Sequence, residues 1–293
     1  MATSPKLVSL PARGRLLVAA DLHGNLRDFL AVVARFERLG DDGHLLLLGD
    51  LLHGPYLGLG AHPGEWSAAS GLPGRPYRDQ SPAIVLQLSL LQERYPGRVF
   101  ALLGNHEHAH IGGPRTGVFA RDEASTLEQR LGVESSIWLN GYLKSWPLWA
   151  LAPCGVLFSH AAPGAELGAL SDLENIDYRR YHAPRADQGR RPTAARGKPP
   201  DAASRLLGQL LWETALPPFK AQALLGKVGA NIAVYGHCAV ELGFETIGYE
   251  QLILSSSFAM TDENKRVLER DLTANYLTVE DLRPGAEILP LYS

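Results

Sequence analysis

Five short apolar runs in this chain each lead directly into a side chain that can bind a metal ion. The runs are residues 16–20, 45–48, 98–103, 156–159 and 232–235. Each has the length and composition of a buried β-strand. Because sheets present reactive groups in the loops at the carboxyl ends of their strands, we expect the five loops to converge on one site.

The side chains that follow these runs are oxygen and nitrogen donors. They are Asp21, His23, Asp50, Asn105, His160 and His237. Such a set suits manganese, iron or zinc better than copper or an iron–sulfur cluster. The chain has 2 cysteines, Cys154 and Cys238, so we expect neither a thiolate metal cluster nor a disulfide framework.

Each of these motifs has an ordinary explanation when it is taken alone. An Asp-x-His segment before glycine, as at 21–23, is more often a turn or a helix cap. A histidine at a strand end, such as His160 or His237, is more often a hydrogen-bonded structural residue. Their joint occurrence after five strands favours a metal site. A site with one shared carboxylate suggests two ions, which clamp a phosphoryl group and activate water as hydroxide.

His106 stands beside Asn105 and is left over as an imidazole that binds no metal. Its unperturbed pKa would lie near neutral pH, so His106 can protonate the oxygen that leaves phosphorus. Later in the chain, the segment 179–200 is rich in Arg, Pro and Gly and is expected to be an irregular loop. An arginine of this loop that reaches a phosphate is chemically expected.

Length and composition permit one large domain or two small ones. With 293 residues and 45% hydrophobic content, we expect one domain over 1–293, with a core at 14–283 and long loops at 54–80 and 179–200. The net charge of -3 gives no electrostatic argument for nucleic acid or an anionic membrane. No apolar stretch reaches roughly 18 residues and no signal peptide is evident, which predicts a cytoplasmic protein.

Hydrophobic spacing predicts the remaining elements. Helices are expected at 26–36, where Asn25 can act as the cap, and at 81–93, 121–131, 135–144, 203–212 and 219–225. Further strands are expected at 148–152, in a hairpin with 156–159, and at 244–247, 251–254 and 276–279. The first 13 residues read as a loose lead-in.

At this point the motifs resemble those of a known family. Asp21-Leu22-His23-Gly24, Gly49-Asp50, Gly104-Asn105-His106-Glu107, Ser159-His160-Ala161 and Gly236-His237 are similar in order and spacing to the calcineurin-like metallophosphoesterases, in their phosphoprotein phosphatase branch. The resemblance spans 16–258. The segments Arg191-Pro192-Thr193, Leu210-Leu211-Trp212 and 240–245 also resemble serine/threonine phosphatases. The implied fold is α/β, with two mixed β-sheets packed face to face and helices outside.

The resemblance also implies roles for single residues. One metal ion would be bound by Asp21, His23 and Asp50, and a second by Asp50, Asn105, His160 and His237. His106 would be the catalytic acid, and Arg191 would bind phosphate together with Asn105 and His106. Manganese is the favoured metal, with iron and zinc as alternatives.

The second motif departs from the family pattern. The family has Gly-Asp-x-Val-Asp-Arg-Gly, whereas this chain continues from Gly49-Asp50 with Leu51-Leu52-His53-Gly54-Pro55. His53 therefore stands where the family has the acid that orients the catalytic histidine, and Gly54 where it has a phosphate-binding arginine. We expect His53 and Glu107 to lie behind the residues that contact metal and substrate.

These observations predict a metal-dependent phosphomonoesterase. Its substrate would be a phosphorylated protein, carrying phosphoserine, phosphothreonine or phosphotyrosine, or a small phosphate ester. Two alternatives stay open at this point. One is a dinucleoside polyphosphate hydrolase of the same branch, and the other is a metal-binding or phosphate-binding regulatory module with weakened catalysis. The sequence gives no indication of an oligomeric state.

Overall fold

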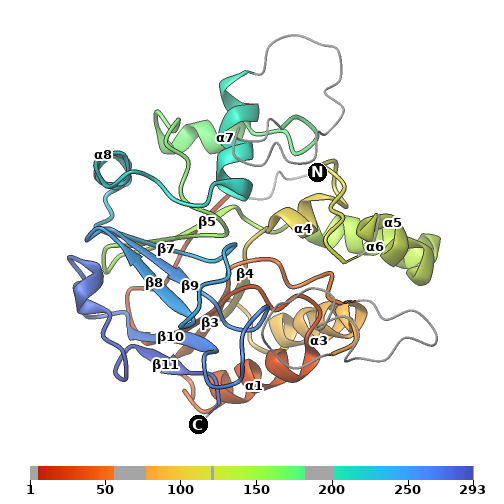
Figure 1. Ribbon diagram of the computed structural model, residues 1–293, viewed down its shortest axis with the longest axis horizontal. Coiled ribbons are helices and arrows are strands. Elements are labelled where there is room, and N and C mark those ends of the chain that lie inside the picture. Colours follow the sequence, from red (N-terminus) through yellow and green to blue (C-terminus); the bar gives the residue numbers. More distant parts are fainter. Residues whose placement is uncertain (1–5, 56–76, 120–121, 182–200, 293) are drawn as a thin grey trace.

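Two mixed β-sheets lie face to face at the centre of the fold, and helices cover their outer sides (Figure 1). The computed structural model describes residues 6–55, 77–119, 122–181 and 201–292. The six-stranded sheet has the order β1-β5-β6-β7-β9-β8, and the five-stranded sheet has the order β11-β10-β2-β3-β4. The α/β fold with two packed sheets is therefore confirmed.

The strands that precede the predicted ligands run parallel within each sheet. In the five-stranded sheet β2 (Arg15–Ala19), β3 (Gly43–Leu47) and β4 (Val99–Ala101) are parallel neighbours. In the six-stranded sheet β6 (Val156–Ser159) pairs in parallel with β7 (Ile232–Tyr235), which pairs in parallel with β9 (Gln251–Leu254). Their loops therefore leave at common edges.

The other strands complete the two sheets. They are β1 (Leu7–Ser9), β5 (Trp149–Ala152), β8 (Phe244–Ile247), β10 (Arg266–Asp271) and β11 (Ile288–Pro290). The hairpin of β5 with β6 is antiparallel, as predicted, and β8 is antiparallel to β9. Strand β10 is antiparallel to both β2 and β11.

In the described part of the chain, six helices lie close to their predicted ranges, whereas α4 (Asn105–His108) and the 3-10 turns η1 (Leu170–Asn175) and η3 (Val279–Asp281) were not predicted. The six are α1 (Leu26–Glu37), α3 (Ser81–Arg94), α5 (Glu123–Leu131), α6 (Val133–Leu143), α7 (Ala202–Trp212) and α8 (Pro218–Val228). The predicted cap of the first helix is present, because Oδ1 of Asn25 accepts a hydrogen bond from the backbone N–H of Asp28. The helix therefore begins immediately after the first ligand loop.

Alternation along the strands builds the core. Leu16 and Val18 of β2 pack in the cluster between the sheets, together with Phe158 of β6. Leu17 and Ala19 of the same strand face the helices instead. A strand buried on both faces has no polar side to turn toward water, which is why these runs are continuously apolar. Such packing on both sides holds the strand ends firmly in place.

Three strands were not predicted, and one predicted strand is wrong. The lead-in contains β1, a three-residue edge strand parallel to β5. Strands β10 and β11 escape recognition because β10 is charged and β11 is short and ends in Pro290. The segment 276–279 is not a strand. Its aromatic residue, Tyr276, is buried against the guanidinium of Arg270, which lies 3.7 Å from the ring centroid.

Among the described residues, no helix combines the length and apolarity that a membrane crossing would require.

Candidate metal centre

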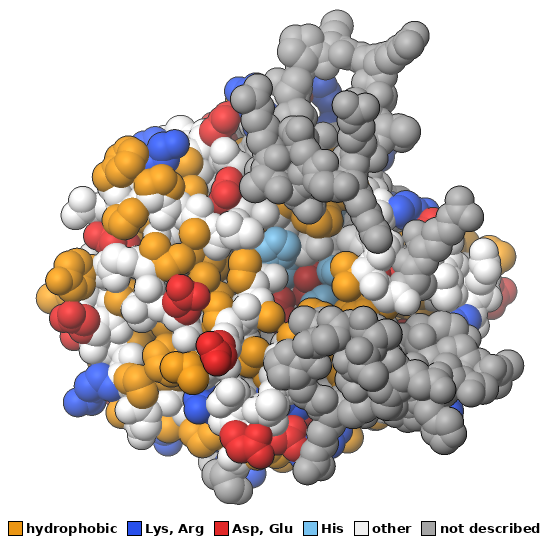
Figure 2. Space-filling model, in the orientation of Figure 1, with side chains coloured by type: hydrophobic (Ala, Val, Ile, Leu, Met, Phe, Trp, Pro, Cys, Tyr) orange, Lys and Arg blue, Asp and Glu red, His pale blue; other side chains and the backbone are white. Residues whose placement is uncertain are grey.

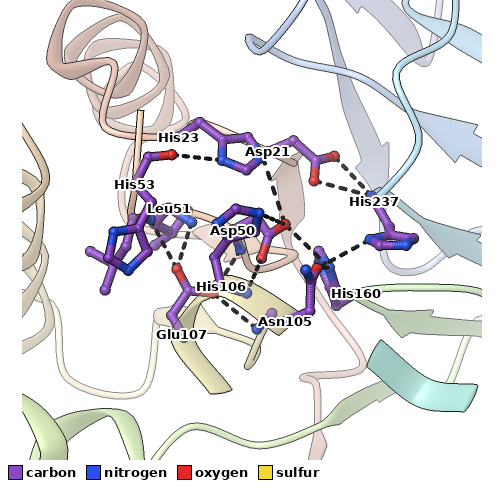
Figure 3. A network of polar contacts seen from close by, with 12 residues as sticks. Asp21, His23, Asp50, Leu51, His53, Asn105, His106, Glu107, His160 and His237 are labelled. Carbon is purple, nitrogen blue, oxygen red and sulfur yellow. Dashed lines mark hydrogen bonds and ion pairs between the residues drawn. The ribbon is translucent and has the colours of Figure 1, made fainter. Parts of the chain in front are cut away.

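The predicted ligands come together where loops from both sheets meet (Figure 3). Asp21 follows β2, Asp50 follows β3, Asn105 opens α4 behind β4, His160 follows β6 and His237 follows β7. The five predicted strands therefore converge as expected. In the space-filling view, histidine and acidic side chains gather near the middle of one face, in a hollow between the surrounding atoms (Figure 2).

Two groups of donor atoms share the carboxylate of Asp50. His23, Asp50 and His106 form the first group, and Asp50, His160 and His237 form the second, with the donor atoms of each within 4.8 Å of one another. Oδ2 of Asp50 lies 3.7 Å from Nε2 of His23 and 3.5 Å from Nε2 of His160. A carboxylate between two groups of donors is the arrangement that a two-metal site needs.

Asn105 contacts donor atoms of the second group, whereas Asp21 contacts only the backbone of one of its members. Oδ1 of Asn105 lies 2.8 Å from Nε2 of His160 and 3.2 Å from Nδ1 of His237. The carboxylate of Asp21 accepts hydrogen bonds of 3.1 and 3.0 Å from the backbone N–H of His237. The first and last ligand loops are thereby joined across the two sheets.

Backbone carbonyls determine which nitrogen of two ligands carries the proton. Nδ1 of His23 lies 2.9 Å from the carbonyl of His53, and Nδ1 of His160 lies 3.0 Å from the carbonyl of Leu48. A carbonyl can only accept, so each Nδ1 is the protonated nitrogen. In the neutral rings Nε2 then turns its lone pair toward the oxygens of Asp50 and Asn105. Lone pairs that face oxygen atoms repel them unless a cation binds both, so the donor set fits divalent metal ions.

Burial keeps these imidazoles in the form that binds metals. Burial lowers the pKa of His23 to about 4 and that of His237 to about 3, and it also lowers the pKa of His160. Burial and the charge of Asp50 raise the pKa of Asp21. For Asp50, burial opposes ionisation, but the surrounding imidazoles lower the pKa below its ordinary value. His23, His160 and His237 are therefore neutral imidazoles beside an ionised Asp50.

The ligand loops hold an unusual backbone conformation. Positive φ angles occur at Asp21 (54°), His23 (43°), Asp50 (51°), His53 (61°) and His237 (67°). Residues other than glycine seldom adopt this left-handed region, and each instance costs on the order of 1 kcal/mol. Strain of this kind concentrates at functional sites. Its concentration in four ligands and one neighbour indicates that the loops are shaped for binding.

Glu107 joins the loops that follow β3 and β4. Its side chain is fully buried. Oε2 accepts from the backbone N–H groups of Asp50, at 2.8 Å, and Gly104, at 3.0 Å. Oε1 accepts from those of Leu51 and Leu52, at 2.8 and 2.9 Å. The carboxylate therefore holds Asp50 in place without facing the site itself.

His53 lies behind the site but makes no hydrogen bond to His106. Its Nε2 lies 2.9 Å from Nε2 of His110, and Nδ1 of His110 lies 2.8 Å from a carboxylate oxygen of Glu128. The ring centroids of His53 and His106 are 5.9 Å apart. The histidine thus belongs to a separate row of side chains that ends on α5.

Gly54 is required by its surroundings. A Cβ atom at this position would lie 2.1 Å from the backbone carbonyl of His23. An arginine in place of Gly54 would therefore displace the ligand loop that carries His23. The local packing therefore explains why this chain has glycine, and not the arginine of the family motif, at this position.

One residue beside His106 was not part of any motif recognised in the sequence. Oε2 of Glu123, at the start of α5, lies 2.9 Å from Nδ1 of His106. Both side chains are buried. Glu123 stands in an ordinary helix and carries no recognisable pattern, so only the fold reveals this contact. Arg191, the predicted phosphate ligand, lies outside the described residues.

Comparison with known proteins identifies the family and the fold. The model of the calcineurin-like phosphoesterase family matches residues 14–241. A protein serine/threonine phosphatase from Saccharomyces cerevisiae has a similar structure, with a TM-score of 0.60 and 17% identity over 91% of this chain and 76% of that chain. A cold-active protein-tyrosine phosphatase from the psychrophile Shewanella SP. gives a TM-score of 0.55 and 16% identity, over 92% and 80%. No curated protein matches the chain.

Replacement of Glu107 by alanine is expected to destabilise the protein severely and weaken metal binding. Four backbone N–H groups would lose their acceptor, and each buried group left without one costs about 1–3 kcal/mol. Thermal unfolding and metal titration would measure the two effects. Glu134→Ala, in the first turn of α6, is the control. Equal melting temperatures for both variants would contradict the role given to Glu107.

Proposed function

The chain belongs to the calcineurin-like phosphoesterase family, which hydrolyses phosphate esters, and from this premise we propose that it is a metal-dependent phosphatase of phosphorylated proteins. The observation that carries the proposal is the carboxylate of Asp50, which is shared by two groups of side chains whose donor atoms could hold metal ions. Protein phosphatases with a similar fold support the choice of phosphoserine, phosphothreonine or phosphotyrosine as the reacting group.

Two divalent metal ions fit the residues of the centre, with manganese as the proposed metal. Asp21, His23 and Asp50 would hold one ion, and Asp50, Asn105, His160 and His237 would hold the other. When bound, such ions neutralise phosphoryl oxygens and lower the pKa of water. Asp50 would contribute to both sites, because Oδ2 of its carboxylate lies near Nε2 of His23 and Nε2 of His160.

His106 lies among the first group of donors but differs from His23 in charge. Burial opposes protonation of His106, but the carboxylates of Asp50 and Glu123 outweigh it and raise its pKa to about 9. The pKa of His23 is lowered to about 4. At neutral pH His106 is therefore a proton donor, whereas His23 is a neutral ligand. This difference supports the assignment of His106 as the acid that protonates the leaving oxygen.

Aromatic rings border the centre on the side of His23. The ring of His23 lies 5.5 Å from that of Phe119 and 4.6 Å from that of Phe258. The two phenylalanine rings are themselves 5.3 Å apart and approach edge to face. An apolar wall beside the metal-binding residues can exclude water and contact the carbon skeleton of a phosphorylated residue.

A substrate screen tests the proposed function. Purified protein loaded with manganese, iron or zinc is expected to release phosphate from phosphopeptides faster than it cleaves diadenosine polyphosphates. Asp50→Asn is expected to abolish turnover and to lower the bound metal measured by elemental analysis. Asp271→Asn, an exposed residue that bonds only Thr273 among described side chains, is the control. Preference for the dinucleotides, or full activity of Asp50→Asn, would overturn the proposal.

Replacement of the acid should depend on the leaving group. His106→Asn is expected to lower kcat by roughly 10²–10⁴ on alkyl phosphates, because their leaving oxygen needs a proton. The loss should shrink with nitrophenyl phosphate, whose leaving group departs as an anion. Steady-state kinetics on both substrates would measure the difference. An equal loss on both would assign His106 another role.

Phosphate capture is expected to depend on Arg191, because Gly54 has no room for a side chain. Arg191→Ala should lower kcat/KM on the order of 10²-fold, the scale of one lost charged donor in the transition state. It should also weaken inhibition by inorganic phosphate. Lysine should restore little, since it lacks the planar fork of arginine. Arg190, the neighbour of Arg191, could substitute for it, so Arg190→Ala is tested as well. Wild-type kinetics for both variants would exclude the segment 179–200 from phosphate binding.

A further inference from the structure

We infer that Glu123 is the residue that positions His106, in place of the acid that the second motif lacks. The inference rests on the proposed function, in which His106 donates a proton. Oε2 of Glu123 and Nδ1 of His106 form an ion-pair contact of 2.9 Å. Their side chains are only 2% and 5% exposed. Both atoms are buried and, among the described residues, have no hydrogen-bond partner, so the ion-pair contact is what compensates their charges.

The contact determines which proton His106 can donate. A carboxylate accepts only from a protonated nitrogen, so Nδ1–H faces Glu123. Nε2 is then the nitrogen on the opposite side, and it lies 4.0 Å from Oδ2 of Asp50. The ring therefore points its second N–H into the centre. Without Glu123, no carboxylate at Nδ1 would fix the tautomer or the rotation of the His106 ring.

Glu123 neither gains nor loses a proton in the reaction. As the bond between phosphorus and the leaving oxygen breaks, the electron pair stays on that oxygen. The oxygen takes the proton from Nε2 of His106, while the oxygen of a water that has lost a proton to the solvent forms the new bond to phosphorus. Nδ1–H remains on the ring opposite the carboxylate of Glu123, which stabilises the positive charge before the transfer.

Glu123 is itself held in place from two sides. Its other oxygen, Oε1, accepts a hydrogen bond of 2.6 Å from the backbone N–H of Phe119. Its backbone N–H donates to the carbonyl of Thr116 at 3.2 Å. It lies in the first turn of α5, whose cap is Asp122, so the helix dipole also favours a negative charge there. The carboxylate is therefore fixed before His106 reacts.

The histidine at the motif position cannot take this role. Nε2 of His53 is occupied by His110, and His110 contacts Glu128 on the same helix as Glu123. A second imidazole beside a protonated His106 would oppose its charge rather than balance it. Helix α5 thus supplies two carboxylates, Glu123 to His106 and Glu128 to His110. Only the first reaches the acid.

Glu123→Gln tests the role of the charge with little change of shape. The amide can still accept from Phe119 but cannot balance a protonated imidazole. The kcat for an alkyl phosphate is expected to fall on the order of 10²-fold, with KM nearly unchanged and a smaller loss on nitrophenyl phosphate. Glu123→Asp, which keeps the charge, should retain several-fold more activity than Gln. Equal losses for Asp and Gln would contradict an electrostatic role.

A double-mutant cycle separates positioning from support of the fold. In a His106→Asn background, Glu123→Gln should cause almost no further loss of kcat, because its effect passes through the ring. Glu128→Gln is the matched control on the same helix, and it should leave the dependence on the leaving group unchanged. Losses that multiply in the double variant would show that Glu123 acts by another route and would overturn the inference.

A spectroscopic readout does not depend on activity. The Nδ1–H proton of His106 should give a downfield resonance in the proton NMR spectrum of the purified protein. The resonance should be absent from Glu123→Gln and His106→Asn but present in Glu128→Gln. Its persistence in Glu123→Gln would overturn the inference. If wild-type protein hydrolyses no phosphate ester, the proposed function fails, while this spectrum still decides whether Glu123 holds the ring.

Discussion

The carboxylate of Glu107 is the interaction on which the metal centre depends. It binds four backbone N–H groups and so connects the loops behind β3 and β4. These loops carry Asp50 and His106, and the backbone N–H of His106 in turn donates to Oδ1 of Asp50 at 3.0 Å. One buried side chain therefore fixes the distance between Asp50 and His106, the proposed shared ligand and the proposed acid. The strained φ of Asp50 can persist because its surroundings are held this firmly.

The histidines around Glu107 and Asp50 differ in the group that their Nδ1 atoms contact. His23 and His160 each direct Nδ1 to a backbone carbonyl, so their Nε2 atoms carry the lone pair that a metal ion would need. His106 directs Nδ1 to a carboxylate instead. A carbonyl leaves an imidazole neutral, whereas a carboxylate favours the imidazolium. The partner behind each ring thus matches the roles proposed here, a metal ligand for His23 and His160 and a proton donor for His106.

Sequence reasoning found the strands that carry the ligands because continuous apolar runs followed by Asp, Asn or His are visible locally. It missed β10, whose charged residues Glu269 and Arg270 find their partners only in the folded protein. Glu269 contacts Arg15 and lies 3.2 Å from Arg35. Glu123 was missed for the same reason, since nothing in its neighbours in the chain indicates His106. The extent of the single domain and the roles of the site residues stay predictions.

The position of strand β10 limits where the chain can be truncated without exposing the edge of a sheet. The family match ends at residue 241, yet β10 lies between β2 and β11 in the sheet that presents Asp21. A fragment that stops at the end of the match would leave β2 with an open row of backbone donors and acceptors. Apolar open edges of this kind pair with other chains. Such a fragment would contain every predicted ligand and would nevertheless tend to aggregate, so the limits of sequence similarity are narrower here than the limits of an autonomous folding unit.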